Sequence, residues 1–199
     1  MKMKGIPGTM MLQVRAVIRN KEGEILREIP WRRSHSFVKQ FLDFIYCAFL
    51  DDIVINLRKT DGDLQGVSGP DLGSYTFLDL TGGINDDQVG IVIGRGDDAE
   101  WNQSYALSNR ILDGSSLNQM EFGETTFGDT WVDGSSALWN VYRVFSNNSG
   151  ATITIKEIAL YCEANDITTY QFMIARDLLT VVVADGENTT IEYRMQITV

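Results

Sequence analysis

The amino-acid sequence predicts an all-β fold, mainly an antiparallel β-sandwich of jelly-roll type with one helix. In residues 190–199 polar and apolar side chains alternate strictly, as in a strand with one buried and one wet face. Other short apolar runs are separated by Gly, Asn and Asp turn residues, which is typical of sandwiches. Apolar residues recur at helical spacing in one stretch, residues 36–50. The chain has 199 residues, 44% of them hydrophobic, so residues 11–199 can form a single domain around one core.

Residues 1–10 are predicted to form an N-terminal arm that packs little against the domain. The segment shows no apolar alternation and is interrupted by glycines and a proline. Ordering such a segment costs roughly 1 kcal/mol or more per residue. We therefore expect the arm to become ordered only against a partner, on which Met3 and Ile6 bury apolar surface.

Two alternating segments follow the arm and predict a first hairpin. The segment at residues 11–19 places four apolar side chains on one face: Leu12, Val14, Ala16 and Ile18. The second segment groups Ile25, Ile29 and Trp31. Gly23 supplies the turn between the two strands.

Residues 36–50 are the one helix that the spacing predicts. Ser36 is a suitable N-cap for it. Phe37, Phe41 and Phe44 belong to an apolar stripe that extends beyond one face of the helix. Because the stripe is wide, we expect the helix to lie across a sheet or against a neighbouring subunit.

The middle of the chain contains four further features. Residues 60–73 are rich in Gly and Asp and are predicted to form a long loop. Residues 89–93 are apolar throughout, which indicates a buried strand. Residues 138–145 are apolar on both faces apart from two positions, as in a central strand. At Lys156 and Glu157 the parity of the apolar residues switches, which predicts a β-bulge.

The end of the chain is predicted to be a β-hairpin with one apolar face. Residues 178–183 are apolar, rich in Val and too short for a stable helix. Asp185-Gly186 in the link accepts the positive φ of a tight turn before the final alternating strand. We expect most of the preceding chain to cover the apolar face of this hairpin.

Composition and charge argue against two classes of partner. The chain has 17 basic and 27 acidic residues, and its net charge of -10 opposes binding to nucleic acid or to anionic membranes. The simplest interpretation of this acidity is solubility. Two isolated cysteines, Cys47 and Cys162, are no disulfide framework. The start of the chain lacks the apolar run of a signal peptide, so we expect synthesis and folding in a reducing cytosol.

No residue set predicts catalysis, a metal or a cofactor. His35 is the only histidine, and its Arg and Ser neighbours are a poor metal shell. Acidic turns near residues 61–63, 86–87 and 97–100 match no EF-hand, so solvated turns are favoured over calcium sites. Residues 94–99 match G-x-G-x-x-A and contain an Arg-Gly-Asp tripeptide, but the residues that follow do not predict a helix start. An ordinary Gly-rich turn is therefore favoured there.

The tryptophans raise an alternative function. Trp139 lies in an apolar strand and is predicted to be a core residue. Trp101 and Trp131 lie in loop-like segments, where exposed aromatic residues more often mark a protein interface. Together with residues 60–73, the same two tryptophans could instead form a platform on which sugars stack.

Six short motifs follow one another in the second half of the chain: GIVIGRG at 90–96, YAL at 105–107, VYRVF at 141–145, NSG at 148–150, EIALY at 157–161 and MIAR at 173–176. With the aromatic-rich helix after a hairpin and the final alternating strand, they resemble a pattern in virion proteins of tailed phages. The resemblance implies a β-sandwich component of a capsid or tail, with no catalytic residues to carry over. Residues 95–98 depart from the pattern, which has small and hydroxyl residues there.

We therefore predict a non-enzymatic virion structural protein, made in the host cytoplasm and assembling as a homo-oligomer with other virion proteins. Its place would be on the capsid or tail, as a decoration, adaptor or tail component. Besides Met3 and Ile6, the candidate interface side chains are Trp31, Phe37, Phe41, Phe44, Trp101 and Trp131. The alternative is a carbohydrate-binding or adhesin module that uses the loop tryptophans.

Overall fold

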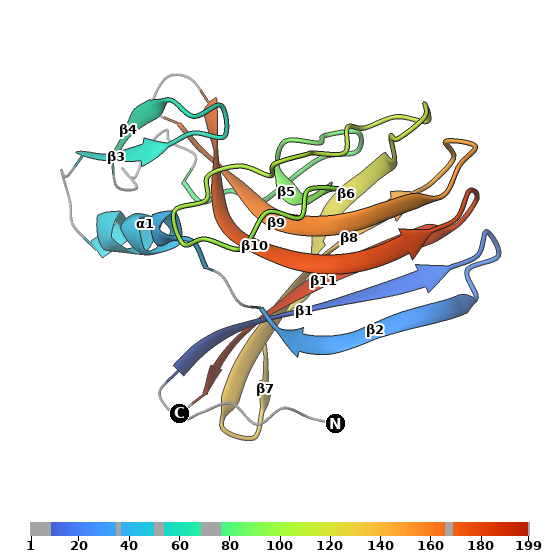
Figure 1. Cartoon of the computed structure of the whole chain (residues 1–199). Coiled ribbons are helices and arrows are strands. Elements are labelled where there is room, and N and C mark those ends of the chain that lie inside the picture. The colour runs from blue at the N-terminus through green and yellow to red at the C-terminus, as the bar shows by residue number, and fades with distance from the viewer. Residues whose placement is uncertain (1–8, 35–36, 50–53, 69–76, 166–168, 199) are drawn as a thin grey trace.

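The computed structural model describes residues 9–34, 37–49, 54–68, 77–165 and 169–198, and it is built mainly from antiparallel strands (Figure 1). In the described structure 57% of the residues are in strands and 6% are helical. The predicted all-β sandwich is therefore confirmed.

Two sheets form the sandwich. The large sheet has the order β2–β1–β11–β8–β6, and β7 also pairs with β8. Its strands are β1 (Thr9–Arg19), β2 (Ile25–Arg33), β6 (Glu121–Phe127), β7 (Trp131–Asp133), β8 (Ser136–Ser146) and β11 (Asn188–Thr198). The small sheet has the order β10–β9–β5, with β5 (Gly90–Gly94), β9 (Ile153–Asn165) and β10 (Thr169–Val183). Because β8 pairs with β11 on one side and with β6 and β7 on the other, the prediction of a central strand at 138–145 is confirmed.

The hydrophobic core lies between the two sheets. The first hairpin has the predicted inward face, since Leu12, Val14, Ala16 and Ile18 are all buried in the core. Val14 pairs with Tyr193 of β11, whose ring is fully buried. Gly23 has a φ of 86° in the turn between β1 and β2, a value that a glycine adopts without strain.

The predicted C-terminal hairpin is wrong, although its tight turn exists. Glu187 N–H donates to the carbonyl of Ala184 at 3.0 Å, so the chain does reverse there. However, β10 pairs with β9 in the small sheet, whereas β11 pairs with β1 and β8 in the large one. The turn therefore crosses from one sheet to the other. Both strands have an apolar face, and these faces meet across the core instead of lying side by side.

The strands β8 to β11 follow a jelly-roll winding. β8 and β11 are neighbours in the large sheet, and β9 and β10, which lie between them in sequence, are neighbours in the small sheet. This arrangement is that of a long hairpin folded over on itself. It brings the two ends of a stretch of about 60 residues (136–198) into one ladder.

The predicted irregularity at Lys156 and Glu157 is confirmed, but the extra residue lies in β10, where Leu179 and Thr180 are opposite Lys156 alone. Ile155 and Ile158 both face the core, and the register between β9 and β10 shifts between Leu178 and Val181, opposite Lys156. The two residues between the isoleucines, Lys156 and Glu157, both contact the segment at 96–109 on the other side of the small sheet. The bulge thus directs a carboxylate and an ammonium group to the same surface segment.

Arginines from the large sheet bind carbonyl oxygens along both edges of the small sheet. On one edge, fully buried Arg143 of β8 donates to the carbonyls of Val89 (2.8 Å) and Ile91 (3.0 Å). On the other edge, Arg27 and Arg32 of β2 donate to carbonyls of β10. These bonds use backbone acceptors that an open sheet edge leaves unpaired.

One end of the sandwich is covered by α1 (Lys39–Phe49) and a separate hairpin of β3 (Val54–Arg58) and β4 (Leu64–Ser68) (Figure 1). The helix lies within the predicted range, and its proposed cap, Ser36, is outside the described residues. Part of the predicted loop at 60–73 is wrong, because β4 pairs with β3 across a turn at residues 59–63. Five residues with a central glycine are too short a pattern to distinguish a strand from a loop without its partner.

The predicted arm overlaps the large sheet by two residues. Thr9 and Met10 belong to β1 and pair with Thr198 and Ile197. Residues 1–8 lie outside the described part of the chain, so the arm stays a prediction. No helix in the described ranges is long and apolar enough to cross a membrane.

Candidate functional site

The outer face of the large sheet, turned away from the core, carries a network of polar side chains from its central strands. Arg15 of β1 lies opposite Glu192 of β11, and its guanidinium contacts the Glu192 carboxylate at 2.7 Å. Asn140 of β8 donates from its amide nitrogen to the other oxygen of Glu192. Arg194 Nε donates to the amide oxygen of Asn140 at 3.0 Å. Each group therefore holds its neighbour in a fixed orientation.

Two tryptophans from opposite edges of the large sheet stack on this network. The Cζ atoms of Arg15 and Arg194 lie 4.7 and 4.1 Å from the ring centre of Trp31, which comes from β2. Arg194 also lies 5.4 Å from the ring centre of Trp131, which comes from β7. These four side chains are called the Arg–Trp ladder below. The stacked rings leave Arg194 partly buried, and this burial lowers the pKa of its guanidinium.

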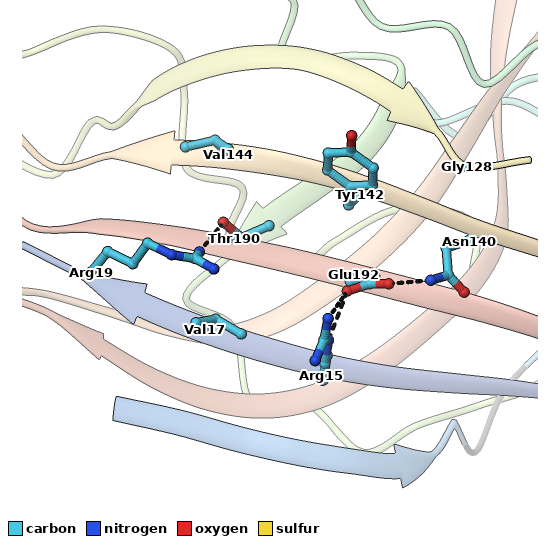
Figure 2. A pocket seen from close by; sticks show the side chains of 9 residues that line it. All are labelled: Arg15, Val17, Arg19, Gly128, Asn140, Tyr142, Val144, Thr190 and Glu192. Carbon is cyan, nitrogen blue, oxygen red and sulfur yellow. Dashed lines mark hydrogen bonds and ion pairs between the residues drawn. The ribbon is translucent and has the colours of Figure 1, made fainter. Parts of the chain in front are cut away.

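A groove of about 370 Å³ lies beside the ladder on the same outer face (Figure 2). Val17, Val144 and the ring of Tyr142 supply apolar surface, and 37% of Tyr142 is exposed. Arg19 and Thr190 line one end, where Arg19 Nη1 donates to the Thr190 hydroxyl at 2.9 Å. Arg15, Asn140 and Glu192 of the polar network also line the groove. We call this space the outer-face groove.

Comparison of the chain with protein-family models, with curated proteins and with solved structures finds no match. In the ranges that the structure describes, no group of three or more His, Cys, Asp or Glu side chains is placed to hold a metal ion.

The inner face of the large sheet carries a second candidate surface where this sheet extends past the small one (Figure 1). One register row across four strands consists of Met10, Ile197, Ala137 and Val132. It continues the inward-facing rows of the core, yet Met10 is 42%, Ile197 50% and Val132 75% exposed.

Aromatic side chains extend this exposed row. Phe127 of β6 is 42% exposed and stacks on Trp139 of β8, with 6.2 Å between the ring centres. Trp139 is itself partly buried and packs against the core, as the sequence predicts. Together Met10, Phe127, Val132, Trp139 and Ile197 form what we call the apolar platform. The sequence shows these residues as apolar but does not show that the second sheet stops short of them.

The two glycines of the motif at residues 94–99 pack closely against the side chain of Glu157. The buried Glu157 carboxylate accepts hydrogen bonds from the N–H groups of Gly96 (3.0 Å) and Asn109 (2.9 Å) and pairs with Arg176 at 3.0 Å. A Cβ atom on Gly94 or Gly96 would lie only 2.6 or 2.5 Å from Glu157 Oε1. Close packing on a carboxylate is thus the reason for both glycines.

The Arg-Gly-Asp tripeptide within this motif is held by its own protein. Arg95 donates to Asn118 at 2.7 Å, and Asp97 pairs with Lys156 at 2.8 Å. The bond from Lys156 lowers the pKa of the exposed Asp97 carboxyl. In the described residues no helix lies between β5 and β6, so the helix start that a dinucleotide-binding motif needs does not follow this segment.

The predicted interface residues are spread over several environments. Met3 and Ile6 lie outside the described residues. Phe41 and Phe44 are buried in the chain's own core, which leaves no side-chain surface there for a partner. Phe37 stacks on Phe41 with 4.2 Å between ring centres.

Trp101 and Trp131, the two tryptophans predicted in loop-like segments, lie in different parts of the molecule. Trp101 is exposed in the segment between β5 and β6. The carbonyl of its neighbour Asn102 accepts a hydrogen bond from the backbone N–H of Lys39 at the start of α1. The prediction of a loop-like segment is wrong for Trp131, which is on β7 of the large sheet and belongs with Trp31 to the ladder. The ladder could not be predicted from spacing, because its members lie up to 179 residues apart (Arg15 to Arg194).

Proposed function

We propose that this chain is a non-enzymatic structural protein of a tailed-phage virion, which assembles as a homo-oligomer and with other virion proteins. The resemblance over residues 90–199 motivates the virion assignment, and the apolar platform is the observation that carries the assembly role. Synthesis in the host cytoplasm and a place on the capsid or tail belong to the same proposal.

The platform favours a second copy of the chain as its occupant. Each copy carries a net charge of -10, so an interface between copies has to avoid opposed acidic groups. The five platform side chains are uncharged and continue the core, as in homodimer interfaces that resemble a divided core. Leaving them exposed costs about 25 cal/mol for each Å² of apolar surface, which association would recover.

Light scattering coupled to size-exclusion chromatography tests the assembly role. We expect the wild-type chain to form an oligomer and Ile197→Asp to be monomeric, since a carboxylate on the platform would be buried unpaired. Ile25→Asp is the matched control, because Ile25 is 59% exposed at the other end of the large sheet and should leave the oligomer intact. A monomeric wild-type protein, or an unchanged Ile197→Asp oligomer, would contradict the proposed interface.

The virion assignment has a separate test. Mass spectrometry of purified particles from a phage-producing host should detect this chain in multiple copies. Particles made with Ile197→Asp should contain less of it, whereas Ile25→Asp should be incorporated normally. Absence of the chain from particles that are otherwise complete would refute the assignment.

A further inference from the structure

The outer-face groove combines an exposed aromatic ring with a fixed set of hydrogen-bonding groups. The ring of Tyr142 and the side chains of Val17 and Val144 line the groove. The carboxylate of Glu192 and the amide of Asn140 line the same space (Figure 2). Apolar C–H faces of a sugar ring pack on aromatic rings, while its hydroxyls need donors and acceptors at set positions.

The polar groups of the groove are oriented before any ligand arrives. Glu192 is held by Arg15 and Asn140, and Asn140 is held in turn by Arg194. Arg194 is fixed between the rings of Trp31 and Trp131. The ladder therefore fixes the orientation of the polar side chains that line the groove. Because these side chains are already ordered, a ligand loses less binding free energy than it would on mobile side chains.

Arg19 adds a positive charge at one end of the groove. Its guanidinium donates to the hydroxyl of Thr190, a neutral group, at 2.9 Å. A guanidinium carries five N–H donors in a planar fork that matches a carboxylate. On a chain with a net charge of -10, a cation at the end of a groove favours an anionic group there.

We propose that the outer-face groove binds a carboxylated sugar, with a sugar ring on Tyr142 and the carboxylate on Arg19. Glu192 and Asn140 accept and donate hydrogen bonds to the hydroxyls. This inference goes beyond the assembly role and is independent of it, because the groove and the apolar platform lie on opposite faces of the large sheet. Monomeric Ile197→Asp should therefore bind the sugar as well as the wild-type chain does.

Gly128 offers a way to close the groove without removing any of its polar groups. It lines the groove, and a Cβ atom there would meet Asn140 at 3.8 Å, which is ordinary contact. A larger side chain should therefore be tolerated by the fold while it fills the space over Asn140. Gly128→Leu thus separates loss of binding from loss of structure.

Isothermal titration calorimetry with tri-galacturonate, maltotriose and glutarate as probes tests the proposal. We expect tri-galacturonate to bind, and maltotriose and glutarate to bind at least ten-fold more weakly. Arg19→Gln should weaken tri-galacturonate at least ten-fold without changing maltotriose. Tyr142→Ala and Gly128→Leu should weaken both sugars. Arg27→Gln, an arginine outside the groove, is the matched control and should leave binding unchanged.

Four outcomes would overturn the inference. The first is the absence of any tri-galacturonate binding at millimolar concentration. The second is equal binding of glutarate, which would show that a carboxylate alone suffices, and the third is equal binding of maltotriose, which would remove the role of Arg19. The last is wild-type binding by Gly128→Leu, which would place the ligand elsewhere. Melting temperatures of all variants establish that each remains folded.

Discussion

Buried charged residues in this protein bind backbone groups from several segments. Arg143 is the clearest case, since its guanidinium donates to the carbonyls of Gly83, Asp86, Val89, Ile91 and Gly123 at 2.6–3.0 Å. Burial lowers its pKa to about 10, which still leaves it charged at neutral pH. The rings of Phe122 and Phe145 lie 5.0 and 6.0 Å from its Cζ atom. In the sequence, Arg143 is recognisable only as a charged exception in an apolar strand.

Removing the Arg143 guanidinium should be severely destabilising. Arg143→Met leaves five carbonyls without their donor, and we expect a loss of roughly 3–4 kcal/mol in the free energy of unfolding. Arg143→Lys keeps the charge but has three donors, so its loss should be intermediate. Urea unfolding followed by circular dichroism measures both. Arg27→Met is the control, because Arg27 is half exposed and should cost under about 1 kcal/mol; equal losses at the two positions would contradict this account.

Two buried tyrosines should make the protein less stable at alkaline pH. Burial raises the pKa of Tyr161 to about 12 and raises that of Tyr193, which donates to Asp177 at 3.0 Å, well above its usual value. In the unfolded chain these phenols lose their protons near pH 10, while the folded chain keeps them. The folded state therefore holds more protons above pH 10, and stability falls as the pH rises.

Urea unfolding at pH 8.0, 9.5 and 10.5 checks this pH dependence. Tyr193→Phe should lose about 1 kcal/mol at pH 8.0, because the bond to Asp177 is gone. Between pH 9.5 and 10.5 its stability should fall less steeply than that of the wild type. The explanation fails if both proteins show the same slope.

At the scale of elements, the bulge between β9 and β10 positions the longest irregular segment of the described chain. The Glu157 carboxylate accepts hydrogen bonds from the backbone N–H groups of Gly96, Ser108 and Asn109. Arg176 of β10 donates both to Glu157 and to the carbonyl of Asp98. A strand without the bulge would turn Glu157 toward the core. One shift of parity thus attaches residues 95–109 to the small sheet.

Gly96→Ala should loosen this segment. The added Cβ would lie 1.8 Å from Ser108 Oγ and 2.5 Å from Glu157 Oε1, so the buried ion pair would have to move. We expect a loss of roughly 1–3 kcal/mol in the free energy of unfolding and faster hydrogen exchange at Asn109. Gly83→Ala is the matched control, because nothing lies within 4 Å of a Cβ at that position. Similar effects of the two substitutions would rule out close packing on Glu157 as the cause.

At the scale of the whole molecule, the two-sheet sandwich differs in strand pairing from the elements that cover one of its ends. β9 is paired on both sides and contributes Cys162 to the core between the sheets. The cover consists of α1 and the β3–β4 hairpin, which form no ladder with either main sheet in the described residues. Cys47 lies in this cover, where its thiol contacts the carbonyl of Val67 at 3.7 Å.

The reactivity of the two thiols should distinguish local opening of the cover from separation of the two sheets. Burial raises the pKa of both Cys47 and Cys162, so neither reacts readily in the folded state. We expect Cys47 to be labelled at least about ten-fold faster than Cys162, because the cover can open without separating the sheets. Timed alkylation followed by peptide mass spectrometry measures the two rates. Equal rates would show that cover and sandwich open together.

Local patterns in the sequence were enough for the class of fold and for individual strands. The faces of β1 and the irregularity at Lys156 follow from a period of two, and the central position of β8 follows from apolar residues on both of its faces. Each segment carries these signals in its own residues. Strand pairing is different, because two apolar strands joined by a tight turn can lie side by side or face each other. The turn before β11 predicts a hairpin, and packing across the core places its strands in separate sheets.

The candidate surfaces also depend on the tertiary structure, because each combines residues from strands that are distant in the sequence. The Arg–Trp ladder joins residues 15, 31, 131 and 194, which meet only when β2, β1, β11, β8 and β7 form one sheet. The apolar platform is exposed because the small sheet ends before it, a difference in extent between two sheets that no single segment encodes. Alternation assigns a side chain to a face, and only the assembled sheets determine whether that face is covered.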